Sequence, residues 1–464
     1  MRRAVVVGAG LAGLVAAERL SAAGLRVTVL EASPKAGGRC RSYRDERLGR
    51  VIDNGNHLIL SSNRAVLRWA ARIGGDAALE ERPAAFPFLD LADGRRWTVR
   101  PGRGPLGALA PAARPPGVGA GALLRDMGRL VLARRGRTVE GAVGAGGPAW
   151  RAFWDPMTRA VLNEDPAEGD AGLLRAALLR SFARGEAAAR PVLAPAGLGA
   201  ALIEPALALL ARRGVEVRLR EPVTALHGAA RVEAVEARGG TVPLGRDGVA
   251  VLALPPRQLA PLLPGVALPG PGRSIANAHF LVPGHGLPPV LALLGGTAHW
   301  LFARGDMVSV TVSAAERGPL EGLGRDAALA LLWADVSAAL RAHGGTGPDA
   351  MPAARFVRER GATFDQSPAG VAARAPARTR LPNLFLAGDH VATGLPATLE
   401  GAVLSGERAA HLALGGRAPR GEEDGVRPHE LGQHPRGRRA APVRRGEERG
   451  PGAPGGAGRV GDEV

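Results

Sequence analysis

The chain contains very little cysteine, lysine or aromatic residue. Its single cysteine, Cys40, excludes an internal disulfide framework and any multi-cysteine metal site, and one thiol fits a reducing compartment. Lys35 is the only lysine, so the formal net charge of +17 is carried almost wholly by arginine. Aromatic residues make up 3% of the sequence, too few for base-stacking platforms, and no helix-turn-helix or zinc-finger spacing is present. We therefore expect no nucleic-acid partner and no metal.

Long apolar runs are missing as well. No stretch approaches the roughly 20 uninterrupted apolar residues that a transmembrane helix needs. The 464 residues, of which 46% are hydrophobic, are nevertheless enough for a large core and predict two or three domains. We expect a cytoplasmic protein, and the excess of arginine suits contact with anionic surfaces, including the inner face of a membrane.

A glycine-rich turn follows the first apolar run. Residues 4–7 predict a strand, residues 11–22 a helix and residues 26–30 a second strand, which together form a βαβ unit. The turn contains Gly8, Gly10 and Gly13 in a G-x-G-x-x-G pattern, so that backbone amides and the helix N-terminus can meet a pyrophosphate. Glu31 ends the second strand, where a carboxylate can accept hydrogen bonds from a ribose diol. These glycines also argue against reading the N-terminus as a signal peptide.

Two further segments carry the signs of a flavin dinucleotide. Gly37 and Gly38 let a loop pass close to the dinucleotide, and Arg39 supplies a planar, permanently charged donor array for its phosphates. For Cys40, beside it, we expect a packing role. The E-x-x-x-x-x-G-G-R-x-x-S arrangement resembles the superfamily of flavin monooxygenases, amine oxidases and phytoene desaturases, which separates FAD from NAD.

The third segment lies near the end of the predicted domain. Gly388 and Asp389 follow a predicted buried strand, residues 383–387, and a helix begins at about residue 397. A carboxylate at the strand end can hold a ribityl or pyrophosphate-adjacent hydroxyl, and the helix N-terminus around Leu399 can face the pyrimidine edge of the flavin. With the first two segments, this one predicts FAD as the cofactor.

The order of these segments predicts an α/β fold, with a Rossmann-type two-dinucleotide-binding FAD domain and an inserted α+β substrate-binding domain. We assign residues 1–81, 200–263 and 354–415 to the FAD-binding domain and residues 82–199 and 264–353 to the substrate domain. Helices are predicted at about 123–135, 150–162, 200–213, 325–343 and 397–414. Further strands are predicted at about 215–219, 231–237, 248–254 and 307–312. Residues 416–464 alternate Arg, Glu, Gly and Pro, and we expect a disordered tail.

Four other segments point to a narrower family. They are residues 50–58 with the Asp-Asn-Gly-Asn-His run, residues 154–156 with 162–166, residues 299–302, and residues 393–401. Together they resemble the squalene-associated FAD-dependent desaturases, which are hydroxysqualene dehydroxylases of hopanoid biosynthesis, over residues 1 to about 415. Two positions depart from that pattern, since His390 stands where a tryptophan is common and Ala303 stands where an aspartate is common before Arg304.

The resemblance implies reductive removal of an allylic hydroxyl from a C30 alcohol to give squalene. It implies a polyisoprenoid lipid substrate, contact with an anionic membrane surface, and other squalene-pathway enzymes as partners. His57 is a candidate to protonate the leaving hydroxyl or to orient the flavin, and Asn54 a candidate to hydrogen-bond flavin or substrate; both also suit plain structural roles. Asp53, before Asn-Gly, suits the cap of a local turn.

Aromatic residues of the inserted stretches are candidates for the wall of a lipid tunnel or for plain core packing. These residues are Phe153, Trp154, Trp300 and Phe302. Two other functions stay open, an FAD-dependent desaturase or oxidase acting on a carotenoid precursor or an amine, and a non-catalytic FAD-binding scaffold. An amine oxidase needs an aromatic cage, and Tyr43 is the only tyrosine.

Overall fold

The computed structural model describes residues 1–104, 107 and 110–416. Residues 417–464 of the predicted disordered tail lie outside this part of the chain. Within the described residues, no helix is both long enough and apolar enough to span a bilayer.

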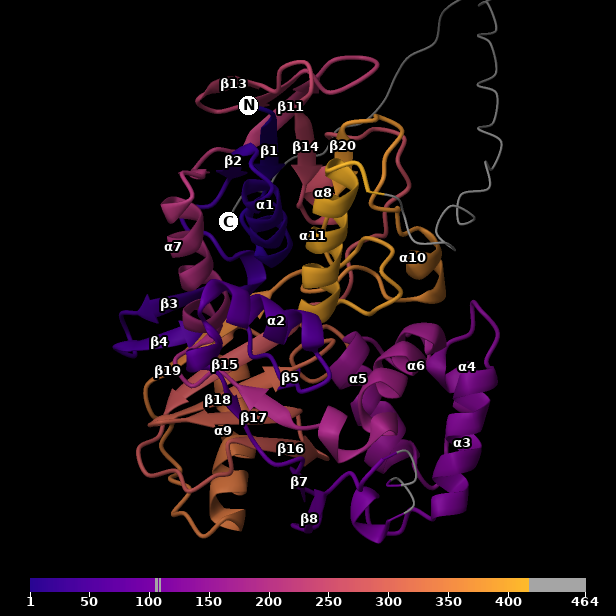
Figure 1. Cartoon of the computed structure of the whole chain (residues 1–464). Coiled ribbons are helices and arrows are strands. Elements are labelled where there is room, and N and C mark those ends of the chain that lie inside the picture. Colours follow the sequence, from indigo (N-terminus) through magenta and orange to yellow (C-terminus); the bar gives the residue numbers. More distant parts are fainter. Residues whose placement is uncertain (105–106, 108–109, 417–464) are drawn as a thin grey trace, which may run out of the picture. The chain divides into compact units, whose positions relative to one another are not determined.

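A five-stranded parallel sheet carries the N-terminal βαβ unit (Figure 1). Its order is β10-β2-β1-β14-β20, with β1 (Arg3–Val7), β2 (Arg26–Glu31), β10 (Glu216–Leu219), β14 (Val249–Leu252) and β20 (Leu384–Leu386). The short valine-rich strands β1 and β14 are buried almost throughout, as expected for a parallel sheet covered on both faces. The predicted α/β class is confirmed, because one sheet draws strands from three separated stretches of the chain.

Three helices pack beside this sheet. Helices α1 (Leu11–Ala22) and α11 (Leu399–Ala413) contact each other along their lengths, and α7 (Glu204–Arg212) packs against α1. Gly406 of α11 allows the close approach, since a Cβ there would lie 2.3 Å from the carbonyl oxygen of Ala12. The first and last helices of the described chain thus share one core with the parallel sheet.

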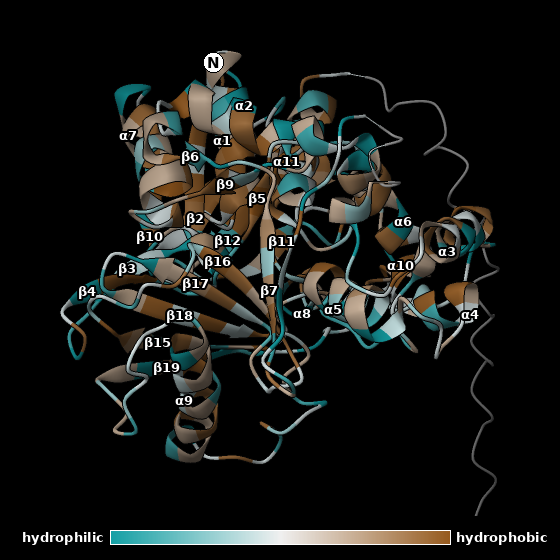
Figure 2. Ribbon diagram, turned by 90° about the horizontal axis from the view of Figure 1, so that it is seen from below, coloured by the Kyte–Doolittle hydropathy of each residue, from teal (hydrophilic) through white to brown (hydrophobic). Residues whose placement is uncertain are grey.

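A seven-stranded sheet forms the second large layer. Its order is β19-β15-β18-β17-β16-β7-β8, and β16 and β7 are its only parallel neighbours within the described residues. The strands are β7 (Phe86–Asp90), β8 (Arg96–Val99), β15 (Ile275–Leu281), β16 (Val290–Leu294), β17 (Trp300–Arg304), β18 (Met307–Val312) and β19 (Ala354–Glu359). Helix α9 (Arg325–Ala342) packs on it through an apolar core, and the strands of both large sheets are predominantly hydrophobic in Figure 2.

A group of helices forms a third core. It contains α3 (Ala120–Leu132), α4 (Val139–Val143), α5 (Asp155–Leu162) and α6 (Ala171–Arg180). The helices predicted at 150–162 and 200–213 each begin with a π-helical turn, η5 (Trp150–Trp154) before α5 and η8 (Gly199–Ile203) before α7. Pro156 and Pro205 follow these turns. A proline ring clashes with the carbonyl four residues earlier, and a wider turn relieves that clash.

The remaining elements are short. Small sheets contain β3 (Ser42–Asp45) with β4 (Arg50–Asp53), β5 (Ile59–Leu60) with β9 (Pro191–Leu193) and β6 (Glu80–Glu81), and β11 (Val223–His227) with β12 (Ala234–Ala237) and β13 (Gly240–Pro243). The other helices are α2 (Arg64–Ile73), α8 (Pro256–Leu259) and α10 (Pro368–Ala372). Single 3-10 turns are η1 (Gly38–Cys40), η2 (Asp76–Ala78), η4 (Pro111–Ala113), η6 (Phe182–Arg184) and η7 (Glu186–Ala188).

Candidate functional site

The turn after β1 is shaped by its glycines. Gly8 has a φ of +101°, and its amide donates to the Leu30 carbonyl over 2.7 Å. A Cβ on Gly13 would lie 2.0 Å from the Gly8 carbonyl oxygen, so the helix approaches the turn as closely as it does only with glycine at position 13. A Cβ on Gly10 would meet nothing within 4 Å. The backbone therefore leaves open space at the N-terminus of α1, where Gly10 provides no side-chain cap for the first amides.

Glu31, at the end of β2, stabilises this turn by hydrogen bonds. Its Oε2 accepts a hydrogen bond from the Ala9 amide over 2.7 Å, and its Oε1 accepts one from the Ser33 amide over 2.8 Å. A carboxylate has about four lone-pair sites, so two acceptor positions remain for a ribose diol. Its role toward a ribose stays a prediction.

The loop that contains Gly37, Gly38 and Arg39 packs against the turn. The Gly37 amide donates to the Ala9 carbonyl over 2.8 Å, and a Cβ on Gly38 would lie 3.3 Å from Cα of Gly10. Arg39 reaches across the chain, and its Nη2 donates to Oδ1 of Asp389 over 2.7 Å. Its Nη1 donates to the Ala362 carbonyl over 2.6 Å. Two of the five N–H bonds of Arg39 are thus taken up within the protein, and the others remain for a phosphate.

Cys40 follows Arg39 and is buried. Burial raises the pKa of its thiol to about 12, so the thiol is neutral at physiological pH. This state agrees with the packing role predicted for it.

Asp389 lies buried just after β20. Burial by itself would raise the pKa of this carboxyl, but the facing Arg39 guanidinium outweighs burial and lowers the pKa below its usual range. The preceding Gly388 has a φ of +135°, and its amide donates to Oγ of Ser405 over 2.8 Å. Asp389 is therefore an ionised carboxylate on a fixed backbone, close to the predicted dinucleotide turn through Arg39.

His390 is buried to 1% exposure beside this carboxylate. Neither of its ring nitrogens has a hydrogen-bond partner among the described residues. Burial lowers its pKa to about 4, so the ring is neutral at physiological pH. Buried polar groups in native proteins are normally satisfied. The His390 nitrogens are closed off from solvent, whereas the open space at Gly10 fits a site that a bound dinucleotide completes.

Arg374 fixes the backbone on both sides of His390, a role that no sequence motif indicates. Its guanidinium donates to the carbonyls of Asp389 (2.9 Å), His390 (3.2 Å), Val391 (2.5 Å) and Leu395 (2.8 Å) and to Oγ1 of Thr393 (3.2 Å). Its Cζ lies 4.7 Å from the ring centroid of Phe364. Burial lowers its pKa to about 10, which leaves it charged at neutral pH. Five acceptors for one guanidinium make the 389–395 loop a rigid part of the site.

The N-terminus of α11 follows this loop. Thr398 caps the helix, since its hydroxyl accepts a hydrogen bond from the Gly401 amide over 3.1 Å. Leu399 is the first helical residue, and the helix itself holds no acceptor for its amide. The carboxylate of Glu400 turns away and accepts hydrogen bonds from the amides of Ala65 (3.0 Å) and Val66 (3.1 Å) at the start of α2. Helix α11 is thereby anchored with its free amides at the predicted flavin edge.

Asn54, a candidate catalytic residue, is buried and engaged by protein partners. Its Oδ1 accepts a hydrogen bond from Arg41 over 3.0 Å, and its Nδ2 donates to Oε2 of Glu359 over 2.7 Å. This arrangement suits the structural role that the sequence left open for Asn54. Its part in catalysis stays a prediction.

His57 is half-buried, and its Nδ1 lies 3.0 Å from the carbonyl oxygen of Gly55. Because a carbonyl only accepts, Nδ1 carries the proton in the neutral ring and Nε2 is then an acceptor. Burial lowers the pKa of His57, which makes the neutral ring the main form at pH 7. His57 can therefore donate from Nε2 only in its protonated form.

Asp53 does not cap a local turn, and that prediction is wrong. Its carboxylate accepts hydrogen bonds from the Ser42 hydroxyl, from the Leu198 amide over 3.0 Å and from Nη1 of Arg304 over 2.8 Å. Because these partners come from distant segments, the local Asp-Asn-Gly pattern gives no sign of them. One of these partners, Arg304, directly follows Ala303, a position at which the sequence departs from the family pattern.

A chain of polar side chains lies beside the 54–57 segment. Asn277 on β15 is fully buried, and its Oδ1 accepts a hydrogen bond from the Thr311 hydroxyl over 2.9 Å. Nδ2 of Asn56 donates to Oγ1 of Thr311 over 3.0 Å. Neither Asn277 nor Thr311 was predicted from the sequence, and only the polar residues Asn277 and His279 within the mostly apolar run at 275–281 could have indicated the first.

The four aromatic candidates fall into two places. Trp154 is buried to 1% in the helical core, where its Nε1 donates to Asp126 over 3.3 Å, and Phe153 packs edge-on against it. Trp154 is thus core rather than tunnel wall. Trp300 on β17 is half-buried beside Phe88, with the ring centroids 6.3 Å apart, and Phe302 is buried on the same strand. Of the four, Phe153 and Trp300 are the two that are only half-buried and keep exposed surface.

Comparison with known proteins adds three findings. Residues 11–414 match the family model described as flavin containing amine oxidoreductase. The chain is 43% identical over 423 residues to a hydroxysqualene dehydroxylase of Rhodopseudomonas palustris, covering 89% of this chain and 99% of that enzyme. It is 41% identical to one of Sinorhizobium fredii, covering 88% and 97%. Its fold is similar to that of cyclohexylamine oxidase from Brevibacterium oxydans, with a TM-score of 0.68 at 14% identity, covering 89% of this chain and 99% of that one.

Proposed function

Because the chain belongs to the family of flavin-containing amine oxidoreductases, we propose that it is an FAD-dependent oxidoreductase that removes the hydroxyl of hydroxysqualene to give squalene for hopanoid biosynthesis. The observation that carries this proposal is the identity of about two fifths along nearly the whole length of relatives named for that activity. The likeness to cyclohexylamine oxidase supports the fold alone, since sequence identity with it is low.

The reaction sets the requirements for the site. The C–O bond of the allylic alcohol breaks, a C–H bond forms, and the hydroxyl leaves as water once it has taken up a proton. FAD in its reduced form, when bound, supplies the hydride. The protein must hold the cofactor, deliver one proton and keep other water away from an electron-poor allylic carbon.

The cofactor is held, in our proposal, by the residues around the dinucleotide turn. Open space at Gly10 and the free amides of α1 suit the pyrophosphate, and Glu31 suits the ribose. On the other side, Asp389 offers an ionised carboxylate to a hydroxyl. The remaining cofactor contacts in the proposal come from Gly8, Gly13, Gly38, Arg39, Gly388 and Leu399.

For the proton, we assign His57 as the donor in its protonated form. Its Nδ1 is hydrogen-bonded to the Gly55 carbonyl over 3.0 Å, and this bond orients the ring. The other ring nitrogen, Nε2, is then the atom that delivers the proton. Asn54, held between Arg41 and Glu359, then positions the 54–57 segment rather than contacting the substrate.

An amine oxidase is the second candidate, and the position of Tyr43 speaks against it. This tyrosine packs against a small separate cluster of Leu48, Ile52 and Met307. An amine substrate at the flavin would need aromatic rings at its ammonium group. A carotenoid-precursor desaturase shares the apolar substrate and differs only in the direction of hydride transfer.

The substrate of this reaction partitions into lipid. A protein with a net charge of +17 and no membrane-spanning helix among its described residues suits peripheral contact with an anionic membrane surface. We propose that the enzyme acts there, on the inner face, beside other enzymes of the squalene pathway.

The test is an anaerobic assay of the purified protein with photoreduced FAD and hydroxysqualene in detergent. We expect flavin reoxidation in step with squalene formation, measured by absorbance and by mass spectrometry. A flavin that stays reduced with hydroxysqualene, while oxidised protein desaturates a polyene, would replace the dehydroxylase with the second function. Oxidised protein reduced by an amine would support the amine oxidase.

A further inference from the structure

Helix α3 exposes apolar side chains on one side. Leu132 is 83% exposed, Leu124 51% and Val131 39%. The spacing of seven and eight residues from Leu124 brings all three to one face of the helix. The opposite face packs into the helical core through Leu123 and Leu130. The exposed apolar side chains therefore belong to a helix whose other face is firmly packed.

The end of this helix is also fixed. Arg175 of α6 donates from Nη1 to the carbonyls of Val131 (3.0 Å) and Ala133 (3.2 Å), where α3 ends. A cation at a helix C-terminus stabilises the helix through its dipole. Leu132, the most exposed of the three apolar residues, thus stands on a capped helix end.

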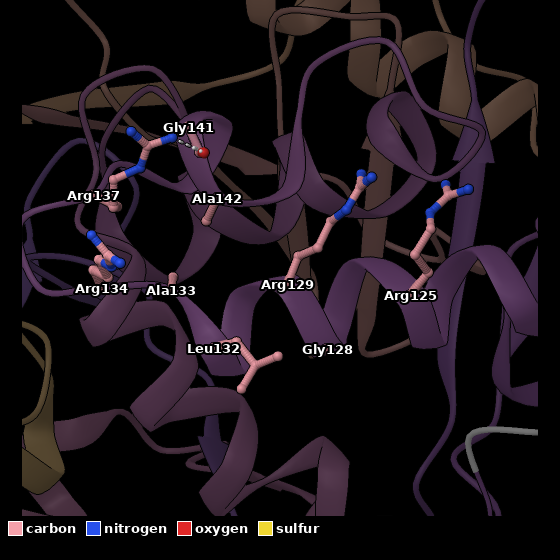
Figure 3. Close-up of a pocket in the computed structure, with 9 residues that line it drawn as sticks. All are labelled: Arg125, Gly128, Arg129, Leu132, Ala133, Arg134, Arg137, Gly141 and Ala142. Atoms are coloured by element: carbon pink, nitrogen blue, oxygen red, sulfur yellow. Dashed lines mark hydrogen bonds between the residues drawn. The ribbon is translucent and has the colours of Figure 1, made fainter.

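Arginines gather around the apolar face. Figure 3 shows Arg125 and Arg129 along α3 with Leu132, and Arg134 and Arg137 just beyond its end, around a pocket of about 540 Å³. Arg135, which lies between the last two in the sequence, is exposed. Figure 2 shows both hydrophobic and hydrophilic residues on α3 and α4.

These positive charges are only partly balanced. The buried Asp126 contacts Arg125 at 3.2 Å and Arg129 at 4.0 Å, while its other oxygen accepts the Trp154 indole. Arg137 donates to the Gly141 carbonyl over 2.5 Å. For Arg134 and Arg135, the described part of the chain offers no carboxylate within ion-pair distance.

We propose that this surface docks on an anionic lipid bilayer. We name it the α3 surface and define it by Leu124, Val131 and Leu132 with Arg125, Arg129, Arg134, Arg135 and Arg137. The arginines bind lipid phosphates, and the three apolar side chains enter the interface between headgroups and acyl chains. The proposal rests on the proposed function, which gives the enzyme a substrate dissolved in membrane.

Charge complementarity favours lipid over another protein as the partner. A docking face for a protein is enriched in aromatic side chains as well as arginine, whereas no aromatic residue is among those that define the α3 surface and its arginines lie beside the aliphatic Leu132. Each arginine near an anionic surface strengthens binding about fivefold. Loss of Arg134 and Arg135 should therefore weaken binding to anionic vesicles by more than tenfold.

The experiment measures cosedimentation of the FAD-loaded full chain with vesicles of phosphatidylcholine, alone or with about one third phosphatidylglycerol. The variants are the pair Arg134→Gln with Arg135→Gln and the pair Leu124→Ser with Leu132→Ser. The matched controls are Arg238→Gln with Arg246→Gln, which are exposed arginines near β12 and β13, and Leu323→Ser, an exposed leucine before α9. Flavin absorbance and circular dichroism check that each variant folds.

We expect salt-sensitive binding to the anionic vesicles alone, weakened at least tenfold in both pairs of α3 variants and unchanged in the controls. Equal binding by the α3 variants, no binding by the wild type, or equal binding to neutral vesicles would overturn the proposal. Turnover of hydroxysqualene in detergent is measured in parallel and should be unchanged in the α3 variants. If no protein turns over while the vesicle results hold, the proposed function fails and the docking surface stands.

Discussion

Arg39 and Asp389 form an ion pair over 2.7 Å although 350 positions of sequence separate them. This pair connects the loop after the first βαβ unit to the end of the last strand of the parallel sheet. The two segments were each predicted to touch the same dinucleotide, and their contact brings the two predictions to one place. The Asp389 side chain of this pair is buried, so water cannot compensate the carboxylate if Arg39 is removed.

Replacing Asp389 with asparagine should weaken FAD binding by about tenfold to a hundredfold, the range for loss of one charge-assisted hydrogen bond. The dissociation constant is measured by titrating the apoprotein with FAD. Glu407→Gln is the control, because it removes from α11 the carboxylate that pairs with Arg19 of α1, away from the site. Similar losses in both variants would mean that the effect reflects general destabilisation.

Glycine substitutions in the dinucleotide turn should separate folding from binding. Gly13→Ala places a Cβ 2.0 Å from the Gly8 carbonyl oxygen, and we expect a large loss of stability. Gly10→Ala meets no atom within 4 Å and should leave the apoprotein as stable as the wild type while preventing FAD binding. Thermal unfolding of apoprotein and flavin content after reconstitution provide the two measurements. A Gly10→Ala protein that binds FAD normally would move the pyrophosphate away from this turn.

Protonation of His57 should make the activity increase as the pH falls. Because burial lowers its pKa below the usual value near 6.5, the protonated donor becomes more abundant as pH falls through that region. We expect kcat/KM to rise from pH 8 toward pH 5.5 and His57→Gln to flatten this rise, with a loss of about a hundredfold or more. His227→Gln, at an exposed histidine paired with Glu236, is the control. An unchanged pH profile in His57→Gln would assign the proton to water.

Two buried histidines and one half-buried histidine should make the fold sensitive to acid. Burial lowers the pKa of His279, His299 and His390 to about 4 in the folded protein, against about 6.5 in the unfolded chain. Between these values the unfolded state binds more protons, so the free energy of unfolding falls as pH drops from about 6.5 to 4. Each histidine contributes about 3 kcal/mol at most to this loss.

His390→Phe is the sharpest variant for this effect, because neither ring nitrogen of His390 has a partner to lose among the described residues. We expect its unfolding free energy to depend less on pH between 6.5 and 4 than that of the wild type. Urea unfolding of apoprotein at several pH values measures the slope. Equal slopes in the two proteins would mean that His390 is accessible to protons in the fold.

The sequence predicted those features that depend on neighbouring residues. The βαβ unit and its glycines were found because strand, turn and helix lie within 31 residues. Strands β7 and β8 were not identified, since they lie in an irregular proline-rich stretch. Strand β8 pairs with β7, and β7 in turn pairs with β16, about 200 residues later, so the β structure of β7 depends on a distant partner.

The same distinction holds for the candidate site. Gly8, Glu31 and Asp389 could be named because each lies at or just after the end of a strand, at a recognisable spacing. Arg374 could not, because its five acceptors belong to a loop that only the folded chain brings around it. Asp53 was misread for the same reason, as its partners Leu198 and Arg304 lie far along the sequence. Long-range hydrogen bonds leave no periodic trace in a single sequence.

The late position of β20 has a consequence for synthesis on the ribosome. Until residues 384–386 emerge, β14 presents an unpaired edge, and Asp389 and α11, which follow β20, are missing from the cofactor site. A nascent chain with its glycine turn already formed therefore cannot complete that site until nearly 400 residues have been made. Flavin capture is consequently a late event in the life of each molecule, and prematurely ended chains remain flavin-free substrates for chaperones and proteases.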